Sequence, residues 1–301
     1  MKTTRKLPLS KKIVYATQTA IIYALYSFHK ALPLDVSSSI GGWVGRVLGP
    51  GMKASRYARR NLEMAFPEMP RHEIERIIGE VWNNLGRTVC ELPFIASGEL
   101  STRATVVGQE HIEYLKRLGK PALFISAHFG NWELLPQIAK ENGFPLTLIY
   151  RPVNNLKLDK LLLKIREPIY KGMFPKGARG AVNLMRAIAE GNSVAMLVDQ
   201  KMNSGIEVPF LGRPTMTAPA VAELALKYEI PIVLAYVERL EGKAKFKVTV
   251  CKPFFASNTG NRKADVYETM CLINREIENW IRDNPEMWFW VHRRWSKELY
   301  L

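Results

Sequence analysis

Short apolar runs alternate with helical segments from about residue 105 to the C-terminus, and this alternation constrains the fold more than any other feature of the chain. The runs that we predict as strands cover residues 122–126, 146–150, 194–198, 232–238 and 246–250. The segments with helical spacing cover residues 132–141, 156–165, 181–189, 218–227 and 266–281. This order is typical of a mainly parallel sheet with helices on its faces. We therefore expect an α/β fold.

The chain before this alternating part is predicted to be helical. Two short helices are expected over residues 37–48 and 54–65, with a break near Gly49-Pro50-Gly51. A longer helix is expected over residues 71–90. Its apolar positions recur at helical spacing: Ile74, Ile77, Ile78, Val81 and Leu85.

Residues 1–35 are predicted to form a membrane-anchoring N-terminal helix, and residues 36–301 a single folded domain. A charge-free run from residue 13 to 28 follows a basic start that contains Lys2, Arg5, Lys6, Lys11 and Lys12. As a helix this run would be about 24 Å long, which is less than the roughly 30 Å of a hydrocarbon core. A tilted span, a helix in the plane of the bilayer interface and an ordinary buried helix are the three interpretations.

Charge and composition narrow the class of partner. The chain has 43 Lys and Arg residues against 28 Asp and Glu residues, a formal net charge of +15. Such a surface attracts nucleic acid, anionic lipid headgroups or an acidic carrier protein. A hydrophobic content of 47% with a mean hydropathy of −0.10 excludes a disordered chain and a multi-span membrane protein.

The cysteines and the known cofactor motifs point away from metal, nucleotide and disulfide chemistry. The chain has three cysteines, an odd number, and none of them forms a C-x-x-C pair. This favours a reducing location facing the cytosol. Neither zinc-ligand spacing nor a glycine-rich nucleotide loop is present in the sequence, so we expect no metal and no cofactor.

One histidine stands out by its position. His128 follows the predicted strand 122–126 directly, and Glu133 lies five residues later. None of the other histidines has an acidic residue at that spacing. Arg151 and Asp199 also follow predicted strands. Because ligands of parallel sheets bind outside the carboxyl ends of the strands, we expect His128, Arg151 and Asp199 to lie on one rim.

These residue types suit general-base catalysis on an alcohol. A histidine held by a carboxylate can accept a proton, and we expect Glu133 to orient His128 and stabilise its imidazolium. Asn131 is a good N-cap, so the helix after His128 should leave backbone N–H groups free for an oxyanion, a role that Arg151 could also fill. The alternatives are a buried histidine satisfied by a neighbouring carboxylate, and a salt bridge between Arg151 and Asp159 or Glu167.

With these residues placed, the chain resembles the lipid A biosynthesis late acyltransferases, the lauroyl and myristoyl transferases of the glycerolipid-type acyltransferase superfamily. The stretches that carry the resemblance are Pro33-Leu34 before Gly41-Gly42, Arg59-Arg60-Asn61-Leu62 before Phe66-Pro67, residues 128–133, Tyr150-Arg151-Pro152, Asp199-Gln200, residues 209–213 and residues 285–295. Glycerol-3-phosphate acyltransferases differ, since they usually carry Asp where this chain has Glu133.

The resemblance implies an acyltransferase domain over residues 36–301 that takes its acyl chain from acyl carrier protein and acylates a hydroxyl of a lipid A precursor. His128 and Glu133 would be catalytic, and Asn131, Arg151, Asp199 and Gln200 would bind substrate. Arg59 and Arg60 would suit a phosphorylated sugar lipid. The implied location is the bacterial inner membrane, with the catalytic domain on its cytoplasmic face.

Three alternative functions stay open from the sequence. The acceptor could be another glycolipid or phospholipid, since mycobacterial phosphoinositol-mannoside acyltransferases are related. The same base could activate water in a thioesterase. The third alternative is a basic nucleic-acid-binding protein, which would use the aromatic and basic residues from Trp288 to Trp295. The same residues would also suit a membrane interface, or their aromatic rings could pack into the core.

Overall fold

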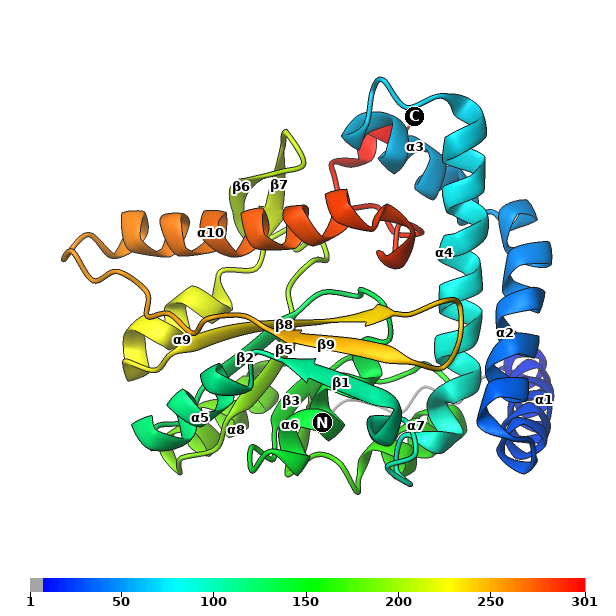
Figure 1. Ribbon diagram of the computed structural model, residues 1–301, viewed down its shortest axis with the longest axis horizontal. Coiled ribbons are helices and arrows are strands. Elements are labelled where there is room, and N and C mark those ends of the chain that lie inside the picture. Colours follow the sequence, from blue (N-terminus) through cyan, green and yellow to red (C-terminus); the bar gives the residue numbers. More distant parts are fainter. Residues whose placement is uncertain (1–7, 301) are drawn as a thin grey trace.

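The computed structural model describes residues 8–300, and its centre is a seven-stranded sheet with the strand order β1-β9-β8-β2-β5-β3-β4 (Figure 1). Strands β8, β2, β5, β3 and β4 are parallel to one another, and β9 runs antiparallel to β8. The strands are β1 Ala104–Val107, β2 Leu123–Ser126, β3 Thr147–Tyr150, β4 Gly172–Pro175, β5 Val194–Leu197, β8 Ile232–Arg239 and β9 Phe246–Val250. The predicted α/β fold with a mainly parallel sheet is confirmed.

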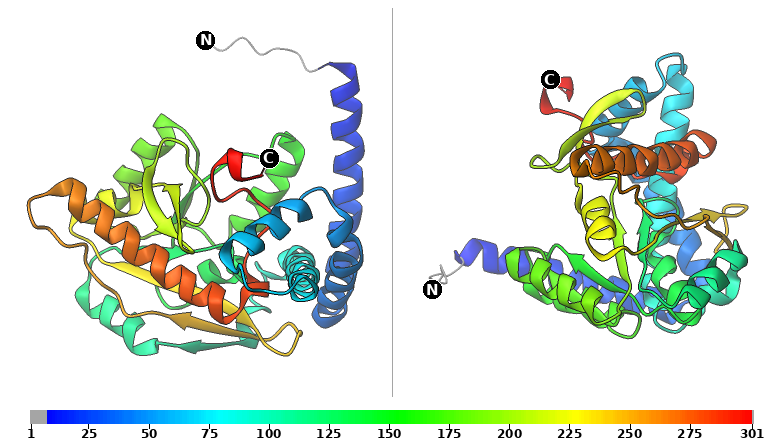
Figure 2. Two further views of the ribbon diagram at one scale, coloured as in Figure 1. Left: turned by 90° about the horizontal axis from the view of Figure 1, so that it is seen from above. Right: turned by 90° about the vertical axis from the view of Figure 1, so that its left-hand side faces the viewer.

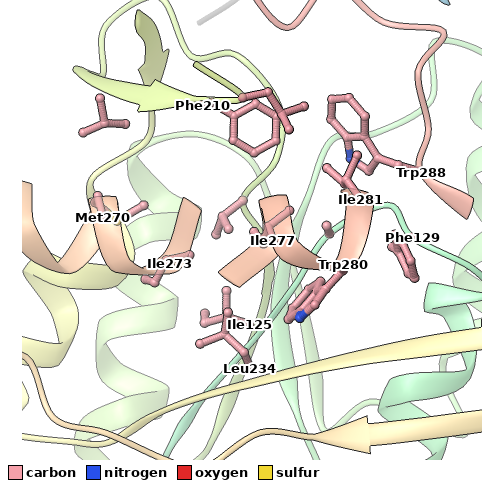
Figure 3. Packing of buried hydrophobic residues seen from close by; sticks show 14 of the residues in the cluster. Ile125, Phe129, Phe210, Leu234, Met270, Ile273, Ile277, Trp280, Ile281 and Trp288 are labelled. Carbon is pink, nitrogen blue, oxygen red and sulfur yellow. The ribbon is translucent and has the colours of Figure 1, made fainter. Parts of the chain in front are cut away.

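Both faces of the central strands are largely buried, because these strands are apolar at most positions. In β8, Ile232 and Leu234 belong to one core cluster, whereas Val233 and Ala235 belong to the other. Figure 3 shows α10 packed over Ile125 and Leu234 of the first face. Helices α8 (Ala178–Ala189), α9 (Ala220–Tyr228) and α10 (Arg262–Asp283) line this face, and α5 (Gln109–Leu118) and α6 (Leu135–Glu141) line the other.

Four helices precede the sheet, as predicted: α1 Leu9–Ala31, α2 Leu34–Leu48, α3 Ser55–Ala65 and α4 Arg71–Glu91. In Figure 1, α4 stands at one side of the sheet, with α2 and α1 on its outer side. Glycines let α2 and α4 approach closely. A Cβ atom on Gly86 would lie 2.0 Å from the carbonyl oxygen of Gly41, so neither helix could keep its position with a larger residue there.

Helix α1 carries many exposed apolar side chains and runs along one side of the molecule (Figure 2). Across residues 8–300, the structure contains no helix that combines the length and hydropathy needed to cross a bilayer. Of the basic residues before the apolar run, Lys2, Arg5 and Lys6 lie outside the described residues.

Candidate functional site

The predicted rim brings His128 and Asp199 into direct contact. Strands β2 and β5 are parallel neighbours in which Ser126 pairs with Leu197, so the residues two positions later emerge side by side. The Nδ1 atom of His128 lies 2.9 Å from Oδ1 of Asp199, and the His128 backbone N–H donates to Oδ2 at 3.0 Å. Asp199 is fully buried, whereas the His128 side chain is 20% exposed. The carboxylate can only accept, so Nδ1 carries the proton and Nε2 is left as the basic nitrogen.

Burial and charge act in opposite directions on this pair. Burial alone would lower the pKa of His128, but the charge and hydrogen bond of Asp199 outweigh it and raise that pKa above its ordinary value. Burial alone would raise the pKa of Asp199, and the charge and hydrogen bonds of His128 instead hold it well below its usual range. Asp199 is therefore ionised, and it favours the protonated form of His128.

The C-terminal segment completes the surroundings of Asp199. The indole Nε1–H of Trp288 donates to Oδ2 of Asp199 at 2.8 Å, and the backbone N–H of Phe289 donates to the His128 carbonyl at 3.0 Å. The rings of Trp132 and Phe289 lie beside the imidazole, with centroids 5.1 and 5.8 Å from it. Asp199 thus accepts three N–H donors and has no freedom to turn. Sequence reasoning gave Trp288 no such role, because nothing in the sequence links it to a residue 89 positions earlier.

Glu133 makes a different contact from the one expected. Two nitrogens of Arg166, the last residue of α7 (Leu156–Arg166), donate to the Glu133 carboxylate: Nε donates to Oε2 at 3.1 Å, and Nη2 donates to Oε1. Within residues 8–300, His128 and Glu133 form neither a hydrogen bond nor an ion pair, so the orienting contact expected from Glu133 is made by Asp199 instead. Between the two residues the chain turns at Gly130, which has a φ of 56°. Glu133 still raises the pKa of His128 through its charge.

Asn131 is buried and does not cap the helix that follows it. Its Nδ2 donates to Oε2 of Glu91 at 2.6 Å, and the first turn after it, Trp132–Leu134, has no side-chain cap. Asn131 stands at the expected N-cap position, but its side chain points into the protein towards α4 and makes no capping hydrogen bond. Its complete burial also leaves it no exposed surface for the substrate contact that we expected.

Arg151 and Gln200 lie on the rim but outside the His128 contact. Both are exposed, and Arg151 makes no hydrogen bond or ion pair with any residue in the described part of the chain. The alternative partner Asp159 instead accepts from the backbone N–H of Val153 at 2.8 Å. Arg59, expected to meet phosphate, is paired with Glu75 at 2.6 Å.

The aromatic C-terminal segment packs into the core and not onto an exposed surface. Trp288, Trp290 and Trp295 are at most 1% exposed, and Figure 3 shows Trp288 near Phe210 and Ile281. The buried interpretation of this segment is therefore confirmed, and the membrane-interface interpretation is wrong for these rings. Burial also removes the stacking platform on which the nucleic-acid interpretation depended.

Two of the three cysteines are unsuited to act as nucleophiles. Burial raises the pKa of the Cys90 and Cys251 thiols to about 11, so neither is an activated thiolate. Among residues 8–300, no group of three His, Cys, Asp or Glu side chains is placed to hold a metal ion. A histidine with a free Nε2 on the sheet rim, backed by a buried carboxylate, is built to take a proton from a bound hydroxyl or water.

Comparison with known proteins gives a consistent assignment. The bacterial lipid A biosynthesis acyltransferase family matches residues 4–297. The lipid A biosynthesis palmitoleoyltransferase of Escherichia coli K12 is 24% identical over 281 residues, covering 88% of this chain and 86% of the relative. The lauroyltransferase of the same organism is 24% identical over 273 residues, covering 88% and 87%.

A more distant relative is the phosphatidylinositol mannoside acyltransferase of Mycolicibacterium smegmatis, which is 22% identical over 200 residues and covers 60% of this chain and 64% of the relative. The family match spans the helical N-terminal part, the sheet and the C-terminal segment together. The resemblance inferred from the motifs is thereby confirmed: the chain belongs to the bacterial lipid A biosynthesis acyltransferase family.

Proposed function

We propose that this protein transfers a fatty acyl chain from acyl carrier protein to a hydroxyl of a lipid A precursor, at the cytoplasmic face of the bacterial inner membrane. The observation that carries the proposal is the His128–Asp199 pair at the sheet rim of a chain that belongs to this acyltransferase family. The pair supplies the base that an O-acylation requires.

In the proposed reaction, Nε2 of His128 accepts the proton of the acceptor hydroxyl as its oxygen attacks the thioester carbonyl. The resulting tetrahedral intermediate collapses to the ester, and the C–S bond breaks. The imidazolium then returns its proton to the leaving thiolate, so His128 ends the cycle neutral. Asp199 stabilises the imidazolium while it exists, and its three N–H donors keep it in place.

Glu133 acts in this proposal through Arg166 and through its charge. The carboxylate holds the guanidinium near the rim, where the Arg166 side chain is 23% exposed. A fixed cation there can stabilise the oxyanion of the intermediate or hold a phosphate of the acceptor. The negative charge of Glu133 adds to that of Asp199 in raising the pKa of His128.

The cations of the rim support binding of acidic partners. Basic side chains follow successive parallel strands: Arg151 after β3 and Lys176 and Arg179 after β4 are exposed, and Lys201 after β5 is half-buried. In the region covered by residues 8–300, none of them forms an ion pair with an acidic side chain. Both an acidic carrier protein and a phosphorylated lipid would be attracted to such a rim.

Exposed apolar side chains on α1 and α2 support association with a bilayer surface. Those on α1 are Leu9, Ile13, Val14, Ile21, Ile22, Tyr23, Leu25 and Phe28, and those on α2 are Val36, Trp43, Val44, Val47 and Leu48. Apolar helix faces with basic neighbours bind the interface of anionic membranes.

Mass spectrometry of lipid A tests the proposal directly. Cells that lack the gene should lose one secondary acyl chain, and the wild-type gene should restore it, whereas His128→Ala should not, because its turnover should fall by about 10²–10⁴-fold. An unchanged profile in the deletion strain would require another acceptor. Release of free fatty acid by the purified protein, without transfer to a lipid A precursor, would indicate a thioesterase.

A further inference from the structure

A buried polar network links the loop that carries His128 to three other elements. At its centre is the ion pair between Glu91, the last residue of α4, and Arg239, the last residue of β8. The two carboxylate oxygens lie 2.5 and 2.9 Å from the guanidinium nitrogens, and both side chains are at most 5% exposed.

The remaining capacity of Glu91 is used by two further donors. Ser38 of α2 donates to Oε1 at 2.6 Å, and Asn131 of the His128 loop donates to Oε2 at 2.6 Å. Each carboxylate oxygen therefore accepts two hydrogen bonds, which satisfies a buried charge that would otherwise be costly. All four side chains are buried, so the network is not a binding surface for a partner.

The same network also holds the backbone of the loop. Arg239 donates through Nε to Oδ1 of Asn84 at 3.2 Å, and Nδ2 of Asn84 donates to the carbonyl of Gly130 at 3.1 Å. The Gly130 N–H donates to the carbonyl of Met287 at 2.9 Å. A Cβ atom at Gly130 would lie 1.7 Å from the Val237 carbonyl oxygen, so the loop is pressed against β8 at this point.

We infer that Glu91, Arg239, Asn84 and Asn131 are positioning residues for His128, an inference that rests on the proposed function. None of them touches the imidazole. They fix residues 130 and 131, whereas Asp199 and Phe289 fix His128 itself. The direction of Nε2 towards a bound hydroxyl therefore depends on two anchors, one on each side of Phe129. A displacement of about 1 Å at a reacting group can lower turnover by 10²-fold.

Asn131→Ala is the variant that tests this role with least risk to folding. It removes one hydrogen bond and leaves Glu91 paired with Arg239 and Ser38. Asn274→Ala is the matched control. Asn274 is also 1% exposed or less, its Nδ2 also donates a single hydrogen bond, to the Pro209 carbonyl at 2.8 Å, and in both asparagines Oδ1 has no hydrogen-bond partner in the described structure.

Transfer from lauroyl-acyl carrier protein to a lipid A precursor would be measured for both variants, beside His128→Ala. We expect Asn131→Ala to lower kcat by about 10- to 100-fold with KM within about twofold of the wild type. Both variants lose one buried hydrogen bond, so their Tm values should fall by similar amounts. Asn274→Ala should nevertheless keep the wild-type kcat. Hydrogen exchange should accelerate at the Gly130 amide in Asn131→Ala alone.

Glu91→Gln supplies a second variant of the same network, because an amide has only one accepting oxygen and so disturbs the bond from Asn131 together with the ion pair to Arg239. Its effect on kcat should not multiply with that of Asn131→Ala, and the double variant should be no slower than about the slower single variant. Equal activity of Asn131→Ala and Asn274→Ala, or multiplication of the two effects in the double variant, would overturn the positioning role. Normal activity of His128→Ala would instead overturn the proposed function.

Discussion

Asp199 sets both the position and the basicity of His128. Two of its three hydrogen bonds go to that residue, and its charge keeps the pKa of the imidazole above the ordinary value. The base of the proposed reaction must be neutral to accept a proton, so activity should decline as the pH falls through the pKa of His128. The raised pKa places this decline at a higher pH than an unperturbed histidine would give.

Asp199→Asn tests whether Asp199 positions His128 and raises its pKa. The neutral amide cannot stabilise the imidazolium, so kcat should fall by about 10²–10⁴-fold. Loss of the negative charge should lower the pKa of His128, and the acid limb of the kcat/KM profile should move to lower pH. Asp265→Asn, which alters another buried carboxylate that accepts from Thr259, should leave the limb in place. An acid limb that stays fixed in Asp199→Asn would exclude Asp199 as the partner of the base.

The sequence predicted the rim residues but not all of their partners. His128 and Asp199 could be placed together because each follows a strand, and parallel neighbouring strands end at the same edge. Sequence analysis chose Glu133 as the partner of His128, and that choice was wrong, because Glu133 is paired with Arg166, which lies 33 residues later at the end of α7. Contacts of this kind are set by tertiary packing and leave no local pattern.

At the scale of elements, the long helices and the central strands were predictable because their apolar spacing extends over many residues. The predicted helix over 71–90 corresponds to α4, Arg71–Glu91, and the predicted strand over 246–250 corresponds to β9. Sequence analysis missed β1, β4 and the hairpin of β6 (Ile206–Phe210) and β7 (Arg213–Thr217). Strand β4 contains Gly172 and Pro175, which weaken a strand signal, and it is tolerated because it lies at the sheet edge.

The close contact between α2 and α4 can be tested with two glycine substitutions on α4, one at the contact and one away from it. Gly86→Ala would place a Cβ atom 2.0 Å from the Gly41 carbonyl oxygen, so it should destabilise the protein by about 1–3 kcal/mol. Gly79→Ala lies on the same helix, where the nearest heavy atom is 3.8 Å from the new Cβ, and it should stabilise by about 0.5–1 kcal/mol through helix propensity.

Chemical denaturation of both variants would measure these two changes in the free energy of unfolding. A stabilised Gly86→Ala would show that α2 can move away from α4 without loss. Because Ser38 of α2 bonds to Glu91 of α4, a displaced α2 should also lower turnover in Gly86→Ala. Gly79→Ala should keep the wild-type turnover.

At the scale of the whole molecule, many exposed apolar residues lie on α1 and α2, the helices that precede the sheet, whereas exposed basic residues follow the strands at the rim. On α2, Val36, Trp43 and Val47 lie at helical spacing on a face that is exposed, whereas Gly41 and Gly42 on the other face pack against α4. One helix thus serves both the interior and an outer surface. Sequence analysis placed the membrane-binding segment within residues 1–35, and the apolar face of α2 extends that proposed surface.

Flotation with vesicles that contain anionic lipid tests this surface. The full-length protein should float with the vesicles, and the bound fraction should fall as salt screens the basic residues. The double substitution of Trp43→Glu and Val47→Glu should weaken binding by about tenfold or more, because it removes apolar burial in the interface. Its Tm should stay close to the wild-type value, since these side chains are 67% and 56% exposed.

Val182→Glu, at a 58% exposed position on α8, is the control and should bind as the wild type does. Equal binding of all three proteins would place the membrane contact away from α2.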